Sequence, residues 1–300
     1  MDNKLKLFCK KFLLVFTVLI VALSFLSSCD YLDELDIEGD VEAQLPVSGQ
    51  NMAVHFIDVG QGDSILIQFP NQQNMLIDAG DNDKGKVVVD YLIDQGVSKI
   101  HYLIATHPHA DHIGGMDDVI DQFEIGDIYM PKIAHTTKTY MDLLEAIERK
   151  NLRIRAAHAG TTITIDDVRA EILAPDIHLD SDNLNDYSVV LKLTYGKTKF
   201  LLQGDAEEKT EESILESGID IRSDVIKLGH HGSSTSSTPS YIEAVDPDYA
   251  IVMVGEGNKY GHPHKEVVAL MDEKGINIYR TDRDGTIVII SDGNKISFNE

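Results

Sequence analysis

Hydrophobic and polar positions follow two different periods from residue 52 onward. Short apolar runs bounded by glycine or aspartate predict strands, and apolar residues three or four apart predict helices. The expected strands are residues 53–59, 64–69, 74–77, 100–106, 128–131, 163–165, 169–173, 188–195, 199–203, 225–228, 249–254, 277–280 and 286–291. The expected helices are residues 85–95, 111–123, 140–150, 207–216, 239–244 and 265–274. Because strands and helices mix in two comparable halves, we expect one α/β domain over residues 52–300, a four-layer αββα sandwich of two sheets covered by helices.

The first 51 residues follow a different pattern. Lysines near the start precede an almost wholly apolar run at residues 12–26, and small residues then lead to Cys29. This order is typical of a secretory signal that ends in a bacterial lipobox, so residues 1–29 are predicted to be a lipoprotein signal peptide with Cys29 as the lipidated residue. A transmembrane anchor is the alternative, but the apolar run is short for a membrane span. Residues 30–51 carry seven acidic side chains, which predict a flexible tether.

Acidic residues outnumber basic ones by 50 to 26, and the formal net charge is −24. A surface with this charge repels a nucleic-acid backbone unless a basic patch or a bound metal compensates. The composition counts mildly against a dedicated nucleic-acid-binding protein, and solubility is its ordinary explanation. The two cysteines are Cys9 and Cys29. Since Cys9 lies in the predicted signal peptide, no disulfide is expected in the mature domain.

The run His107-Pro108-His109-Ala110-Asp111-His112 carries four potential metal ligands directly after an expected strand. Residues two apart in an extended backbone point the same way, so His107 and His109 are expected to form a pair. Asp111 and His112 follow at the turn into a helix and can face a neighbouring ion. Imidazole and carboxylate ligands suit zinc, manganese or iron. The run therefore predicts a hydrolytic site with one or two metal ions.

Further candidate ligands lie at the ends of other expected strands, which are rigid supports for a metal site. Asp205 comes just after a buried apolar run, and its carboxylate can bridge two ions. His230 and His231 follow the strand at 225–228 in the same way, and His230 is preferred as a ligand because it lies nearer the strand end. Asp78 ends the strand at 74–77 and is expected to orient a ligating imidazole.

These motifs, in this order, resemble those of the metallo-β-lactamase superfamily. The run at 107–112 matches its HxHxDH signature, Asp78-Ala79-Gly80 the preceding aspartate motif, Gly204-Asp205 the bridging aspartate, and His230 or His231 the late histidine. Within the superfamily the chain looks most like the metallo-hydrolase domain of ComEC-type competence proteins. Five segments carry that resemblance: Phe56-Ile57-Asp58-Val59-Gly60-Gln61-Gly62-Asp63-Ser64, Asn185-Asp186-Tyr187-Ser188-Val189-Val190-Leu191, Lys227-Leu228-Gly229-His230-His231-Gly232-Ser233, Tyr260-Gly261-His262-Pro263 and Thr281-Asp282-Arg283-Asp284-Gly285. ComEC-type proteins also carry a multispanning channel, to which nothing in this sequence is similar, so we expect a freestanding relative on a lipid anchor.

The resemblance implies two divalent metal ions, zinc or manganese. The implied ligands are His107, His109, Asp111, His112, Asp205 and His230, with Asp205 shared between the ions. Possible further contacts to metal or substrate are Asn185, His231 and Ser233, and the side chains expected to support the ligands from behind are Asp58, Asp63 and Asp78. Many members of the superfamily have one more histidine in the first metal site. Here Asn185 occupies the matching region and is a poorer ligand, which weakens that site or favours manganese.

The implied activity is cleavage of phosphodiester bonds, as in a nuclease or phosphodiesterase, by a metal-activated hydroxide. Asp111 is the expected proton acceptor, and His262 is the expected substrate contact. One alternative is an esterase acting on a cell-envelope polymer such as phosphorylcholine or teichoic acid, and another is a non-catalytic DNA-uptake accessory protein. The expected partners are a small-molecule, nucleic-acid or envelope-polymer substrate and the membrane, through the lipid anchor, with no obligate protein partner. The expected location is the outside of the bacterial cytoplasmic membrane or elsewhere in the envelope.

Overall fold

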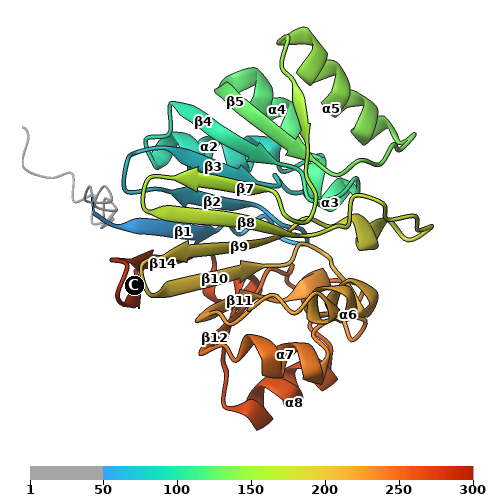
Figure 1. The fold of residues 1–300 in the computed structure, drawn as a ribbon. Helices are drawn as coiled ribbons and strands as arrows, with labels where there is room; N and C mark the ends of the chain where they lie inside the picture. Colours follow the sequence, from blue (N-terminus) through green and yellow to red (C-terminus); the bar gives the residue numbers. More distant parts are fainter. Residues whose placement is uncertain (1–49, 300) are drawn as a thin grey trace, which may run out of the picture. The chain divides into compact units, whose positions relative to one another are not determined.

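Two β-sheets lie face to face, and helices cover the outer face of each sheet (Figure 1). The computed structural model describes residues 50–299. The first sheet has eight strands in the order β15 (Ile296–Phe298), β14 (Ile287–Ser291), β1 (Met52–Phe56), β2 (Ile65–Gln68), β3 (Asn74–Ile77), β4 (Lys99–Ile104), β5 (Glu124–Met130) and β6 (Ile154–Ala156). The second sheet has seven strands in the order β13 (Asn277–Arg280), β12 (Tyr249–Val252), β11 (Val225–Lys227), β10 (Thr198–Leu202), β9 (Val190–Tyr195), β8 (Val168–Ala174) and β7 (Thr162–Ile165). The predicted four-layer αββα sandwich is confirmed.

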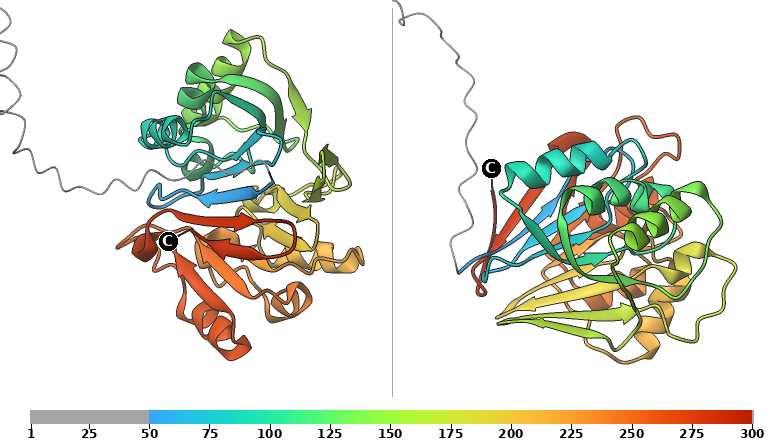
Figure 2. Two further views of the ribbon diagram at one scale, coloured as in Figure 1. Left: turned by 90° about the vertical axis from the view of Figure 1, so that its left-hand side faces the viewer. Right: turned by 90° about the horizontal axis from the view of Figure 1, so that it is seen from above.

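The helices divide between the two sheets (Figure 2). Those on the first sheet are α2 (Gly85–Asp94), α3 (Ala110–Ile113), α4 (Met116–Gln122) and α5 (Lys138–Arg149). Those on the second sheet are α6 (Glu208–Glu216), α7 (Pro239–Val245) and α8 (Lys265–Lys274). Short helical turns complete the chain: η1 (Leu184–Tyr187), η2 (Gly229–Gly232) and α9 (Thr281–Asp284).

Three apolar layers hold these elements together. Strand β2 shows how its sequence serves two of them: Ile65 and Ile67 belong to the cluster between the sheets, whereas Leu66 belongs to the cluster under α2, α4 and α5. Successive side chains of a strand point to opposite faces, so a strand covered on both sides reads as a continuous apolar run. A third cluster, including Tyr241 and Met271, lies between the second sheet and its helices.

In the first sheet and its helices, the structure breaks one predicted element and adds two others. The helix expected at 111–123 is broken into α3 and α4 by Gly114 and Gly115. Strands β6 and β15 were not predicted, and they are the two edges of the first sheet. Each has only three residues, and none of the six is fully buried, so these strands lack the apolar alternation that reveals a half-covered strand.

The predicted signal peptide, lipidated Cys29 and most of the acidic tether lie outside the described residues. Between residues 50 and 299, none of the helices combines the length and the apolar character that a membrane crossing requires.

The sheets bring the ends of several strands to one side of the molecule. Strands β3 and β4 are parallel neighbours in the first sheet, and β10 and β11 are parallel neighbours in the second. Because parallel strands end at the same edge, the segments that follow them converge. Those segments carry Asp78, the run at 107–112, Asp205, and the pair His230 and His231.

Candidate metal centre and catalytic cleft

Four side chains from three segments form a cluster in which each offers a ligand atom within 4.8 Å of the others: Asp111, His112, Asp205 and His231. The Nε2 atom of His112 is 3.2 Å from Oδ1 of Asp205. The Nε2 atom of His231 is 3.3 Å from Oδ2 of Asp111 and 3.5 Å from Oδ2 of Asp205. Two imidazoles and two carboxylates at these separations are a donor set that suits a divalent cation of the zinc or manganese type.

The inner atoms of this cluster test whether a cation fits. Nε2 of His112, Nε2 of His231 and Oδ1 of Asp205 are all buried, and none has a hydrogen-bond partner among the described residues. The 3.2 Å approach of His112 to Asp205 therefore lacks the alignment of a hydrogen bond. Buried polar atoms without partners are costly, and a shared cation satisfies all three at once. The residues present fit a metal ion.

His107 and His109 form the predicted pair beside this cluster. Nε2 of His107 is 2.9 Å from Nδ1 of His109 and 3.9 Å from Oδ2 of Asp205. Oδ1 of Asp205 thus faces His112, whereas Oδ2 lies 3.5 Å from Nε2 of His231 and 3.9 Å from Nε2 of His107, between the cluster and the histidine pair. Asp205 is therefore the residue that would be shared if a second ion were held by the histidine pair. Behind Asp205, its backbone N–H donates to the hydroxyl of Ser188.

Asp78 supports the cluster from behind, as predicted from its place at the end of β3. One carboxylate oxygen accepts the backbone N–H of Thr106 at 2.8 Å, and the other accepts the Thr106 hydroxyl at 2.6 Å and lies 2.8 Å from Nδ1 of His112. These contacts fix the His112 ring so that Nε2 points at Asp205. Burial disfavours the charged imidazole, but the carboxylates of Asp205 and Asp78 outweigh it and raise the pKa of His112 well above its usual value. The surrounding negative charge thus favours a cation here.

The choice between the two adjacent histidines needs a correction, because His231 and not His230 joins the cluster. Both residues have left-handed backbone conformations, with φ of 47° and 54°. This turn breaks the alternation of the preceding strand and sends the two rings in different directions. Nδ1 of His231 is 2.9 Å from the carbonyl oxygen of Met253, which leaves Nε2 for the cluster. Burial opposes protonation, yet Asp205, Asp111 and Asp63 raise the pKa of His231 to about 9.

His230 instead belongs to a polar group with Glu207, a residue that the sequence argument did not identify. Nδ1 of His230 is 2.9 Å from Oε1 of Glu207, and the Thr235 hydroxyl donates to the same oxygen at 2.7 Å. The hydrogen bond from His230 is the main reason that the pKa of Glu207 falls to about 2. Nε2 of His230 lies 3.9 Å from Oδ2 of Asp205, so the ring stands at the border of the cluster. The available signal was the position of Glu207 two residues after Asp205 at a helix start.

Lys227 is a second functional residue that sequence reasoning missed. Its ammonium group is fully buried, forms an ion pair with Asp63, and donates to the carbonyl oxygen of Gly204 at 2.8 Å. Oδ1 of Asp63 is 3.4 Å from Nδ1 of His231, so the expected supporting role of Asp63 is consistent with its position. A lysine in the otherwise apolar strand β11 was the available signal.

Other predicted residues lie farther from the ligand atoms. Asn185 donates weakly to Glu207 at 3.4 Å, and its buried Oδ1 has no partner among the described residues. The hydroxyl of Ser233 is 3.0 Å from that of Thr235. Asp58 is exposed, and its carboxylate accepts the backbone N–H of Gly60 at 2.9 Å. Asp58 therefore closes the glycine-rich turn and does not support the ligands, which corrects its expected role.

A cleft of about 260 Å³ opens above the cluster, and its lining residues are Gln61, His109, Ala110, Asp111, Asp205, His230, His231, Tyr260 and His262. The cleft thus exposes several candidate ligands to a substrate. His262 lies in it as expected: burial and the neighbouring histidines lower the pKa of His262 to about 4, so this imidazole is neutral at neutral pH.

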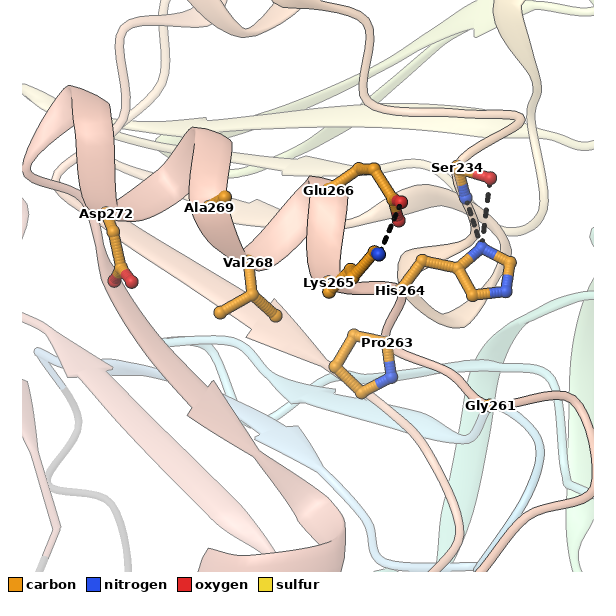
Figure 3. Close-up of a pocket in the computed structure, with 9 residues that line it drawn as sticks. All are labelled: Ser234, Gly261, Pro263, His264, Lys265, Glu266, Val268, Ala269 and Asp272. Atoms are coloured by element: carbon orange, nitrogen blue, oxygen red, sulfur yellow. Dashed lines mark hydrogen bonds and ion pairs between the residues drawn. The ribbon is translucent and has the colours of Figure 1, made fainter.

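A wider surface groove lies between the loop at 261–264 and helix α8 (Figure 3). His264 connects the loop at 261–264 to the loop that carries Ser234, because its Nδ1 accepts the backbone N–H of Ser234 at 2.9 Å. The groove shares none of the cluster residues. The cleft above Asp205 is therefore the better candidate for an active site.

The chain combines two packed sheets, outer helices and a histidine–aspartate cluster at the strand ends. This combination is typical of metal-dependent hydrolases. Residues 57–256 match the family model described as the metallo-beta-lactamase superfamily, so the chain belongs to that superfamily. It is 29% identical over 299 residues to ComE operon protein 3 of Bacillus subtilis (strain 168), covering 92% of this chain and 38% of that protein. It is 32% identical over 237 residues to competence protein ComA of Neisseria gonorrhoeae, covering 78% of this chain and 32% of that protein. The expected similarity to ComEC-type competence proteins is confirmed.

The chain spans about a third of the length of these two relatives. Among solved structures, it is similar to the metallo-beta-lactamase fold protein YhfI from Bacillus subtilis, with a TM-score of 0.54 and 13% identity. That likeness covers 80% of this chain and all of YhfI, and it supports the fold alone.

Proposed function

We propose that this chain is a metal-dependent phosphodiesterase that cleaves nucleic acid. The observation that carries the proposal is the set of buried, unpartnered ligand atoms of His112, His231 and Asp205, two of which belong to residues that line an open cleft. His107, His109 and Asp111 complete the proposed ligands for two divalent ions, manganese or zinc. The names of the relatives, among them Recombination protein 2 of Haemophilus influenzae, support a nucleic-acid substrate.

Divalent ions bound at such a site supply Lewis acidity and lower the pKa of water, so that a nucleophile forms near neutral pH. The chain's own residues place and move the protons. Asp111 lines the cleft, and although burial opposes ionisation, the nearby His231 ring and the charge on His112 keep its pKa below the usual value. Its carboxylate is therefore available to accept a proton from the attacking water.

The leaving oxygen also needs a proton when the bond from phosphorus to that oxygen breaks. His230 is placed to donate it, because Glu207 holds Nδ1 and the ring lines the cleft. His262, which is neutral and whose ring centroid is 5.5 Å from that of His230, contacts the substrate in the proposal. The products are a phosphomonoester and a free hydroxyl group.

The test is hydrolysis of bis-p-nitrophenyl phosphate and of a labelled oligonucleotide by the purified full chain with manganese or zinc. We expect turnover that a chelator abolishes and that added metal restores. Asp205→Asn is expected to lower turnover by at least about 100-fold because the shared ligand is lost. The matched control Asp94→Asn removes an exposed carboxylate outside the cleft and is expected to retain turnover. Oligonucleotide binding without any cleavage would instead support an accessory protein, and ester cleavage alone would support an esterase.

The proposed location is the cell envelope, with Cys29 carrying the lipid. Metabolic labelling with a fatty acid tests this directly. We expect the wild type and the matched control Cys9→Ser to be labelled and to sediment with membranes, whereas Cys29→Ser is not labelled. Labelling of Cys29→Ser would contradict the lipobox assignment.

A further inference from the structure

We propose that Tyr260 is a stacking platform for one nucleobase, so that the cleft selects single-stranded nucleic acid. This inference rests on the proposed function and names the form of its substrate. Tyr260 lines the cleft, and 53% of its surface is exposed. The other large hydrophobic side chains that are exposed within residues 50–299 are Val, Ile and Met, so Tyr260 is the one exposed tyrosine or phenylalanine of that region.

The loop that carries Tyr260 is held in one conformation by Asn258. The side-chain oxygen of Asn258 accepts the backbone N–H groups of Tyr260 and His262, at 3.2 and 3.0 Å. Its amide nitrogen donates to the carbonyl oxygens of Gly255 and His262, at 3.1 and 2.7 Å. An aromatic ring that is exposed on a loop tied by four hydrogen bonds loses little conformational freedom when a ligand stacks on it.

One face of the tyrosine ring is already covered by His262. The two rings are stacked, with their centroids 5.6 Å apart and their planes 23° apart. His262 is stacked in turn on His231, at 6.3 Å and 28°. The row of rings thus runs from Tyr260 to the candidate metal cluster, so a base on Tyr260 would lie two rings away from His231 in the same cleft.

The ring also makes a cation–π contact with the exposed side chain of Lys259, whose Nζ is 5.1 Å from the ring centroid. A cation–π contact at an exposed site is weaker than stacking of a base on an aromatic ring. A base is therefore expected to displace the ammonium group, which then remains close enough to contact a neighbouring phosphate. In a duplex the base faces are covered by neighbouring pairs, so this platform favours single strands.

The charge of the cleft supports stacking as the main source of affinity. Its lining includes Asp111 and Asp205 but, among the described residues, no lysine or arginine. Lys259 lies beside the ring, so its ammonium group can neutralise about one phosphate of a bound strand. We therefore expect a shallow salt dependence, with a slope of log K against log salt near −0.7 per phosphate contacted on a single strand.

The test uses a property of the sequence: the chain contains no tryptophan. The full-length Tyr260→Trp variant therefore carries a single indole, whose emission reports stacking. The probes are an oligothymidylate and a fully abasic oligonucleotide of the same length and charge, added by rapid mixing with manganese and read before turnover. We expect saturable quenching by the oligothymidylate and little by the abasic strand. The matched control Val87→Trp places the indole at an exposed position of α2 outside the cleft and is expected to show no quenching by either.

Kinetics give a second readout. Tyr260→Ala is expected to reduce the preference for oligothymidylate over the abasic strand, measured as the ratio of kcat/KM, by about 5- to 100-fold, and Tyr260→Phe to retain it. Equal quenching by both strands, or an unchanged ratio in Tyr260→Ala, would overturn the inference. Cleavage without base dependence leaves the phosphodiesterase proposal intact, whereas base-dependent quenching without cleavage by the wild type rejects that proposal and retains the platform.

Discussion

The buried ion pair of Lys227 and Asp63 is the most consequential contact at the scale of single residues. Neither side chain reaches solvent, and Nζ of Lys227 is also 3.9 Å from Oδ1 of Asp205. The ammonium group therefore lies next to the candidate ligands, and Lys227 is not among the residues that line the cleft. Burial raises the pKa of Asp63, but the charge of Lys227 and contacts with His231 and His112 leave it below the usual value.

Lys227→Met is expected to lower the free energy of unfolding by about 3–5 kcal/mol, because it leaves the Asp63 carboxylate buried without its cation. Urea unfolding in the presence of a chelator measures this loss. The double variant Lys227→Met, Asp63→Leu removes both charges and is expected to be more stable than the sum of the two single losses predicts. Strictly additive losses would show that the pair is not coupled.

The separation of His230 from His231 leads to a second prediction at this scale. His230→Ala is expected to lower kcat on an oligonucleotide by about 100-fold or more, since the leaving oxygen loses its proton donor. The same variant is expected to lose much less activity on bis-p-nitrophenyl phosphate, because p-nitrophenolate leaves without protonation. Its metal content is expected to match the wild type, whereas His231→Ala loses metal. Equal kcat losses on both substrates, together with loss of metal, would contradict the proton-donor role and show that His230 is a metal ligand.

At the scale of elements, the break between α3 and α4 positions the ligand run. A Cβ atom on Gly115 would lie 2.4 Å from the carbonyl oxygen of Ala79 and 2.6 Å from Cα of Gly85. A Cβ atom on Gly114 would lie 2.3 Å from the backbone nitrogen of Asn82. The two glycines thus allow the backbone after His112 to pack directly on the segment that follows β3.

Gly115→Ala is expected to push this backbone apart and to destabilise the domain by at least about 1–3 kcal/mol. Because Asp111 and His112 precede the glycines, the affinity for manganese is expected to fall as well. Thermal unfolding and manganese titration measure the two effects. The control Gln122→Ala changes an exposed position of α4 and is expected to alter neither. A stable Gly115→Ala variant with normal metal affinity would contradict the positioning role.

The elements also show how far the sequence could lead. Strand ends and the HxHxDH run predicted the convergence of Asp78, His107 and Asp205. Side chains alternate between the two faces of a strand, so the direction of a side chain at the strand end can be predicted. The sequence could not predict that His231 and not His230 joins the cluster. Both residues have left-handed backbone conformations, so the alternation of the preceding strand no longer sets the direction of their side chains. The pairing of Lys227 with Asp63 was equally hidden, because it joins two sheets through a contact that no local pattern encodes.

At the scale of the whole molecule, neither sheet carries the centre alone. The first sheet supplies the run at 107–112, and the second supplies Asp205 and His231. A cation held between them binds only when both halves are folded, so its binding free energy adds to the stability of the whole domain.

Saturating manganese or zinc is therefore expected to raise the Tm of the entire domain in a single transition. At a metal concentration of about 100 times Kd the gain is about 2.7 kcal/mol, or roughly 5–10 °C for a domain of this size. Calorimetry with and without a chelator measures it, and Asp205→Asn is expected to show almost no shift. A shift confined to one of two separate transitions would contradict a centre shared by both sheets.

Anomalous diffraction from crystals soaked in manganese shows directly whether the two sheets together hold divalent cations. We expect one peak bounded by Asp111, His112, Asp205 and His231, and a second beside His107 and His109, both within reach of Asp205. Peaks only at surface carboxylates, with the His112 and His231 rings still facing Asp205 and no ion between them, would contradict this expectation.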